Sequence, residues 1–147
     1  MNTDKNEEQL KGKQEGRMDG DALTARVIGA LFEVSNALGA GFLEKVYERA
    51  LVSELRLQGM RVVEQASFTV RYKGQWVGEY FADLVVEDTV VVELKCVDRF
   101  CDEHMAQCLN YLKASGLKIC LLVNFQKPKV EWRRILLGTP GARDEHG

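Results

Sequence analysis

The chain has 147 residues, 46% of them hydrophobic and two of them proline, which suits one globular domain with a single core. Its net charge of −2 excludes a protein that binds polyanions through overall charge alone. It has neither an apolar run long enough for a transmembrane helix nor the basic-then-apolar start of a signal peptide, so we expect a cytoplasmic protein.

Both ends of the sequence are predicted to be flexible tails. Residues 1–20 are rich in Lys, Glu, Asp, Gln, Asn and Gly and have almost no large apolar side chains. Residues 138–147 are interpreted as a second tail. The predicted domain therefore covers residues 21–137.

Two helices are predicted at the start of this domain. Asp21 can cap the first helix, whose apolar residues recur at helical spacing until glycines end it at Gly39. The second helix is expected from about Leu43 to Gln58, before Gly59.

Glu44 has an unusual place on the second helix. Tyr47, Leu51 and Leu55 form a stripe that should face a sheet, and Glu44 continues this stripe at helical spacing. A Glu on an inward stripe is a candidate third carboxylate of a site. The alternative is a Glu that is favoured at a helix start by the helix dipole.

The rest of the domain alternates between predicted strands and one helix. Strands are expected at 61–72, from the turn at 73–74 through Val86, at 89–95, at 117–125 and at 131–137, and a helix from about Asp102 to Gly116. The order is α-α-β-β-β-α-β-β, which predicts an α/β protein with a mixed β-sheet flanked by helices.

Three charged residues lie in two strongly apolar strands that a tight turn joins. If the turn lies near Asp88, Asp83 and Glu93 fall opposite one another, and Lys95 shares a face with Glu93. Two facing carboxylates repel each other, and burying either one without a partner is costly. A divalent cation would resolve the conflict, so the hairpin predicts a metal-dependent hydrolytic site. The alternative is a buried ion-pair cluster of the same three residues without metal.

The same alternation makes two further predictions about side-chain faces. Phe81, Asp83 and Val85 are expected to share one face of their strand. On the third helix, His104, Gln107 and Tyr111 share a face, where they could contact a ligand or form an ordinary polar surface.

The four cysteines are predicted to be free thiols. Cys96, Cys101, Cys108 and Cys120 lack the close pairs of structural zinc sites, and a cytoplasmic setting disfavours disulfides. A Cys/His metal cluster that includes His104 is the weaker alternative.

Several of these motifs resemble a known family. The segment Gly41-Phe42-Leu43-Glu44-Lys45-Val46-Tyr47 looks like the signature of the GxxExxY protein family. Asp83…Glu93-Leu94-Lys95 resembles the core motif of the PD-(D/E)xK nuclease superfamily, although Ala82 stands where the motif has Pro. Gln107 to Tyr111 is similar to the QxxxY helix motif of its exonuclease-like branch. The resemblance covers about residues 21–137.

The resemblance implies a restriction-endonuclease-like fold and a function. The expected protein is a nuclease that uses Mg²⁺ or Mn²⁺ to hydrolyse phosphodiester bonds in DNA, or less favourably in RNA. Asp83, Glu93 and Lys95 would be catalytic, with Asp83, Glu93 and Glu44 as metal ligands. Gln107 and Tyr111 would position the substrate or the attacking water, and Tyr47 would pack beneath Glu44.

Two alternatives stay open at this stage. A non-catalytic binding module on the same fold is the second function class, since fold does not fix function. A homodimer or a protein partner could help so small a domain to grip DNA.

Overall fold

The computed structural model describes residues 20–137 and 144–146. Apart from Gly20, the predicted N-terminal tail lies outside the described residues, as do residues 138–143 and 147. The elements are α2 (Gly20–Leu38), α3 (Glu44–Leu57), β1 (Val62–Tyr72), β2 (Gln75–Val86), β3 (Val90–Lys95), α4 (Asp102–Ser115), β4 (Ile119–Asn124), β5 (Glu131–Leu136) and β6 (Asp144–His146). The predicted element order is confirmed, with β6 in addition.

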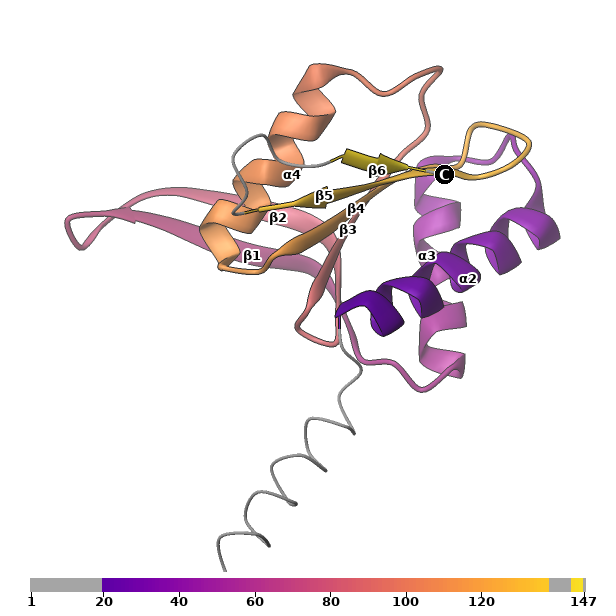
Figure 1. Ribbon diagram of the computed structural model, residues 1–147, viewed down its shortest axis with the longest axis horizontal. Helices are drawn as coiled ribbons and strands as arrows, with labels where there is room; N and C mark the ends of the chain where they lie inside the picture. Colours follow the sequence, from indigo (N-terminus) through magenta and orange to yellow (C-terminus); the bar gives the residue numbers. More distant parts are fainter. Residues whose placement is uncertain (1–19, 138–143, 147) are drawn as a thin grey trace, which may run out of the picture.

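The strands form one six-stranded mixed sheet in the order β1-β2-β3-β4-β5-β6 (Figure 1). Neighbouring strands are antiparallel, except that β3 and β4 run parallel on either side of the α4 crossover. The strand β6 pairs with β5 inside the segment predicted to be a C-terminal tail. Its three polar residues carry no apolar pattern, so only the pairing identifies it as a strand.

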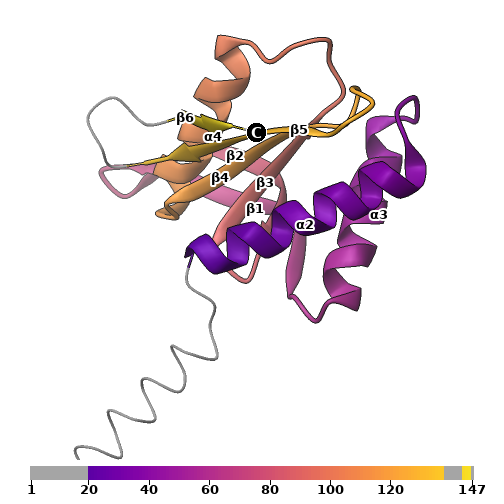
Figure 2. The ribbon, with the colours of Figure 1, turned by 45° about the vertical axis from the view of Figure 1, so that its right-hand side comes forward.

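Helices cover both faces of the sheet. Helices α2 and α3 lie on one face and α4 lies on the other (Figures 1 and 2). Because side chains alternate along β3, Val92 packs towards α2 and α3, and Val91 packs towards α4. The central strands β3 and β4 are buried on both faces, which explains their almost unbroken apolar sequences.

Two tight turns set the register of the first three strands. Lys73 and Gly74 have φ values of 48° and 80°, and Glu87 and Asp88 have 51° and 50°. At Lys73 and Gly74, positive φ at both loop residues is the twist that two-residue hairpins require, and Glu87 and Asp88 begin a three-residue loop that ends at Thr89. The predicted turn near Asp88 is therefore confirmed, and it pairs Val86 with Val90.

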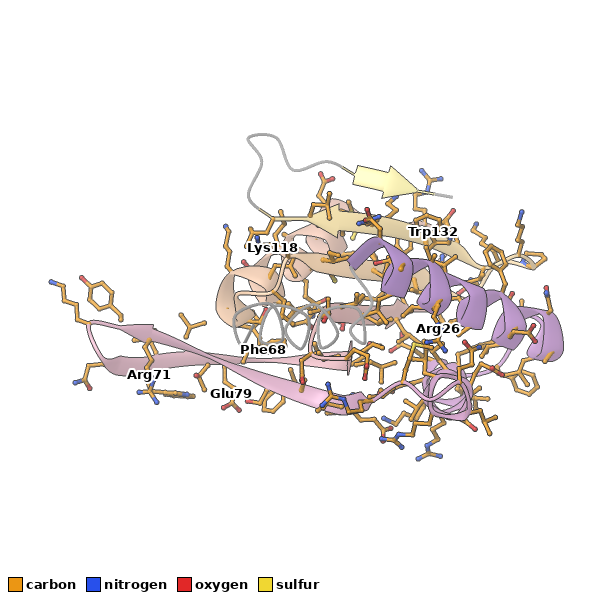
Figure 3. The ribbon with its side chains drawn as sticks, turned by 60° about the horizontal axis from the view of Figure 1, so that its bottom comes forward. Arg26, Phe68, Arg71, Glu79, Lys118 and Trp132 are labelled. Carbon is orange, nitrogen blue, oxygen red and sulfur yellow. The ribbon has the colours of Figure 1, made fainter. Side chains whose placement is uncertain are left out.

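The hairpin of β1 and β2 is much longer than β3. β3 pairs with β2 only along Leu84 to Val86, whereas β1 and β2 continue together to their turn at Lys73 and Gly74. Residues 66–82, called the arm from here on, therefore extend past the sheet as a two-stranded ribbon (Figures 1 and 3).

None of the described helices is long and apolar enough to cross a membrane.

Candidate active site

Asp83 and Glu93 face each other where β2 separates from β3. The backbone pairing of the two strands ends at Leu84 and Val92, one position before this pair. Beyond it, the Asp83 backbone N–H donates to Glu93 Oε1 at 3.1 Å, and the Leu94 N–H donates to Asp83 Oδ2 at 2.8 Å. Each carboxylate thus accepts a backbone N–H from the facing strand beyond the end of the regular pairing. The predicted juxtaposition of Asp83 and Glu93 is confirmed.

The regular alternation of β2 breaks at Asp83. Ala82 and Val85 both pack on the α4 side of the sheet, while Leu84 packs on the opposite side and Phe81 is exposed. The prediction that Phe81, Asp83 and Val85 share one face is therefore wrong. Side chains exchange faces here because both strands of the hairpin depart from regular pairing at this point.

Gln65, on the neighbouring strand β1, accounts for this break in alternation. It faces Asp83 but is left out of the β1–β2 pairing, and its φ is 50° in the middle of a strand. A left-handed conformation of a residue other than Gly is uncommon and costs energy, and such residues cluster at functional sites. This conformation directs the Gln65 amide to Glu48 Oε1 at 3.0 Å and to Asp83 Oδ1 at 3.5 Å.

The conformation of Gln65 can be tested with two substitutions. We expect the free energy of unfolding of Gln65→Gly, measured in urea, to exceed that of Gln65→Ala by about 0.5–1 kcal/mol. Both variants lose the amide, but only Gly adopts the positive φ without strain. The matched pair Ser67→Gly and Ser67→Ala, at an exposed position of the same strand, should show the reverse order. The same order at both positions would contradict the strain.

A buried carboxylate of α3 joins this cluster. Glu48 is 4% exposed, accepts the Gln65 amide and pairs with Lys45 Nζ at 2.9 Å. The sequence indicated Glu44 for the inward position, but Glu44 is exposed as the first residue of α3, although partial burial and then the charge of Asp83 raise its pKa. The residues of the predicted stripe, Tyr47, Leu51 and Leu55, are fully buried. Glu48 lies next to Tyr47 in sequence, which was the available signal for its burial.

Asp83 and Glu93 release their protons less readily than ordinary carboxyl groups do. Burial, and then the charge of Asp83, raise the pKa of Glu93 to about 7. Burial also raises the pKa of Asp83, against the opposing effect of its bond from Leu94. Both shifts have the same physical meaning: the ionised pair is short of positive charge in its present surroundings.

Lys95 provides one positive charge beside this pair. Its Nζ lies 3.8 Å from Glu93 Oε2, and the side chain is half-buried. It also lines an open cavity of about 530 Å³ together with α4 residues that include His104 and Gln107. Burial, followed by the charge of Lys95, lowers the pKa of His104. The structure thus brings the predicted residues Lys95 and Gln107 to one solvent-accessible hollow.

Tyr111 holds Glu93 from the α4 side. Its hydroxyl donates to Glu93 Oε2 at 2.9 Å, and the side chain is almost completely buried. Burial, and then the charge of Glu93, raise the pKa of Tyr111, so this hydroxyl stays a donor. The rings of Phe68 and Tyr80, at the base of the arm, pack against the Tyr111 ring with centroids 6.5 and 6.1 Å away. Gln107 and Tyr111 therefore have different surroundings, although the sequence grouped them.

Removal of this hydroxyl should be measurable. We expect Tyr111→Phe to lower the free energy of unfolding by about 1.5–3 kcal/mol at pH 8, where Glu93 is ionised, because the bond has a charged acceptor. At pH 5 the loss should be smaller. Urea unfolding at both pH values measures the difference, and an equal loss at both would contradict a bond that depends on the Glu93 charge.

Tyr47 stabilises the connection between α2 and α3. Its hydroxyl donates to the Gly39 carbonyl at 2.6 Å and accepts the Phe42 N–H at 3.1 Å, while its ring stacks on Phe125 at 4.7 Å. Gly41 lies in this connection with φ of 113°, which L side chains rarely adopt. Tyr47 thus fixes the loop that precedes Glu44 at the start of α3.

The cysteines are free, and they do not assemble a metal site in the part of the chain that the structure describes. Cys108 and Cys120 are buried. Cys101 precedes α4, where its backbone N–H donates to His104 Nδ1 at 3.2 Å. His104 therefore contributes to the N-terminal capping of α4 by accepting this hydrogen bond.

The donor set of Asp83 and Glu93 fits a hard divalent cation. Both are oxygen ligands, and both have a raised pKa that a cation would oppose. Among the described residues no three acidic, His or Cys side chains converge into a ready-made cage. Mg²⁺ does not require one, because it is commonly held by one or two carboxylates together with water and substrate phosphate.

Two facing carboxylates, a neighbouring Lys and a mixed sheet between helices define an α/β protein with a candidate metal-binding site. The family comparison agrees: residues 21–135 match the model of the PD-(D/E)XK nuclease superfamily, and the chain belongs to this superfamily. A search of curated proteins found no match.

Two solved structures resemble this chain at low sequence identity, and the first of them supports the fold. The protein of the "Crystal structure of SSO0001" is 16% identical with a TM-score of 0.52, over 65% of this chain and 50% of that one. An alkaline exonuclease (LHK-Exo) from Laribacter hongkongensis is 18% identical with a TM-score of 0.47, over 63% of this chain and 55% of its own. The chain thus spans about half the length of these structures. The predicted restriction-endonuclease-like fold is confirmed.

Proposed function

We propose that this chain is a nuclease that hydrolyses phosphodiester bonds in DNA, with RNA less favoured, and that it requires Mg²⁺ or Mn²⁺. The observation that carries the proposal is the pair of raised-pKa carboxylates, Asp83 and Glu93, on facing strands. Carboxyl groups with perturbed pKa values are typical of catalytic sites, and Lys95, which lies beside Glu93, lines an open cavity.

The proposed roles follow from the contacts of each side chain. Asp83 and Glu93 hold the cation, and Glu44 is a further ligand, directly or through water. When bound, the cation supplies positive charge against the charge that develops on the phosphate. The Lys95 ammonium orients the attacking water or stabilises the phosphate oxygens, and the Gln107 amide positions either one from the same cavity.

Two residues act through others in this proposal. Tyr111 keeps Glu93 in place through its hydroxyl, and Gln65 does the same for Asp83 and Glu48. Both are positioning residues, because their polar groups are already engaged with carboxylates.

We also propose membership of the GxxExxY protein family. Its signature here comprises Gly41, Glu44 and Tyr47. The positive φ of Gly41 and the two hydrogen bonds of Tyr47 give two of these positions a structural reason. The proximity of Glu44 to the charge of Asp83 is consistent with a role for the third.

A cleavage assay tests the proposed function. Single-stranded and double-stranded DNA, and RNA of the same sequence, are incubated with the wild-type protein and Mg²⁺, Mn²⁺ or EDTA, beside Asp83→Ala and Lys95→Ala. Cleavage that requires metal and disappears in both variants is expected. Cleavage that persists in both variants would exclude this site.

The alternative function is a binding module without turnover. The favouring observation is that protein donors, from Leu94, Asp83 and Tyr111, already satisfy the carboxylate oxygens of Asp83 and Glu93. No cleavage of any substrate, together with no Mg²⁺ or Mn²⁺ binding by calorimetry, would favour this alternative.

A further inference from the structure

The solvent side of α4 carries a stripe of residues that line open cavities. Along this stripe lie two open cavities, of about 530 and 410 Å³, and Asn110 lines both of them. The first cavity is lined by Lys95 and by Glu103, His104, Ala106, Gln107 and Asn110, and the second by Thr69, Val70, Arg71, Tyr80, Asn110, Lys113 and Ala114. The two cavities adjoin at Asn110, the arm lines the second of them, and the pair is called the α4–arm groove from here on.

The second half of this groove has the chemistry of a phosphate site. Arg71 on the arm and Lys113 on α4 line it from opposite walls, and no carboxylate is among its lining residues. Among the described residues, neither cation has a carboxylate within ion-pair distance. The remaining polar side chains, Thr69, Tyr80 and Asn110, are neutral hydrogen-bonding groups. An anion is the ligand that two unpaired cations and neutral donors favour.

The groove has the length of a short piece of nucleic acid. Gln107, Asn110 and Lys113 follow one another at three-residue steps, which places the ends of this row about 9 Å apart along the helix axis. This distance corresponds to roughly two to three nucleotide steps of a stacked strand. Lys95 lines the first cavity, and Arg71 and Lys113 line the second, so a strand that follows both cavities from a cleaved phosphate at Lys95 would meet these two cations.

We propose that the phosphodiester backbone of one nucleic-acid strand lies along the α4–arm groove, with Arg71 and Lys113 binding the phosphates beside the cleaved bond. This inference rests on the proposed nuclease function and adds the path of the substrate. It also gives the arm a role: the arm supplies one wall of the groove. Its base packs through Phe68 and Tyr80 on Tyr111, which holds Glu93.

The test measures binding separately from cleavage. Fluorescence anisotropy with labelled single-stranded and duplex DNA of one sequence, in EDTA over a series of salt concentrations, compares the wild-type protein with Arg71→Ala/Lys113→Ala. The matched control, Lys118→Ala/Lys129→Ala, removes the same charge from two side chains that line neither cavity: Lys118 precedes β4, and Lys129 lies over Phe32 of α2. Cleavage with Mg²⁺ is measured in parallel.

The groove variant should bind DNA at least about tenfold more weakly than the control variant, and the slope of log affinity against log salt should fall by about two. The strand type that shows this loss identifies the natural substrate form. If the wild-type protein cleaves DNA but the groove variant matches the control in affinity and slope, the groove proposal is overturned and the nuclease function stands. If the wild-type protein neither binds nor cleaves DNA, and does not cleave RNA in the cleavage assay, the proposed function and the groove are both overturned.

Discussion

Asp83→Asn is expected to lower the rate of metal-dependent DNA cleavage by at least about 100-fold while the fold stays intact. The amide oxygen of Asn can still accept the Leu94 N–H, so the end of the β2–β3 pairing is preserved. What disappears is the negative charge beside Glu93, and with it a ligand for the cation. Initial cleavage rates at increasing Mg²⁺ or Mn²⁺, together with thermal unfolding, measure both effects.

The control for this prediction lies on the same hairpin. Asp88→Asn removes an equal charge from the exposed turn between β2 and β3, where Asp88 lies 3.7 Å from Arg61. Asn tolerates the positive φ of this position, so cleavage and stability should both stay close to wild type. Equal cleavage rates for Asp83→Asn and Asp88→Asn would show that Asp83 has no special part in the reaction.

Glu93→Gln is expected to abolish cleavage and, at pH 8 without metal, to raise the melting temperature by a few degrees. Glu93 is buried beside Asp83, and its pKa of about 7 lies above the ordinary value of 4.5. At pH 8 the folded protein therefore holds the buried Glu93 charge next to the partly buried Asp83, a carboxyl group of the same sign. The amide removes the Glu93 charge and keeps the size of the side chain, and about 1 kcal/mol shifts the melting temperature of a domain of this size by roughly 2–8 °C.

The pH dependence of this effect has a definite sign. Between pH 4.5 and about 7 the folded state holds the Glu93 proton that the unfolded state has released. The wild-type protein without metal should therefore lose stability as the pH rises through this window, and Asp83 contributes with the same sign. Melting temperatures from pH 5 to pH 8 should fall for the wild type and change less for Glu93→Gln. Parallel profiles would contradict the raised pKa.

A bound divalent cation should offset the same repulsion between the Asp83 and Glu93 carboxylates. At pH 8, added Mg²⁺ or Mn²⁺ should raise the melting temperature of the wild type, because a ligand of the folded state stabilises it. The increase should be smaller for Glu93→Gln, which has lost one ligand.

A large part of the fold and of the site could be predicted because it depends on local patterns. The turn at Glu87 and Asp88 and the strict alternation of Val91, Glu93 and Lys95 were sufficient to place Glu93 opposite Asp83. The helical spacing of Tyr47, Leu51 and Leu55 predicted the buried face of α3. Periodicity of this kind is a property of the backbone itself, so neighbouring residues in sequence reveal it.

Other features were missed because they depend on departures from these patterns. Gln65 has a left-handed backbone inside a strand, and nothing in its flanking residues predicts a break there. The break moves Phe81 to solvent and brings Gln65 to Glu48, a residue that the spacing of α3 did not distinguish from Glu44. The hydrogen-bond partners of Gln65 on two other elements, α3 and β2, hold this strained backbone conformation in place.

The sequence by itself determined the order of the elements, the hairpin and the two facing carboxylates, because each follows from the two-residue period of strands, the helical period or a tight turn. Only the tertiary structure decided which side chains surround those carboxylates. Tyr111 meets Glu93, and Arg71 lines a groove opposite Lys113, across distances in sequence that no local pattern spans. Burial and charge, which set the pKa of Glu93, arise only when these separate elements pack together.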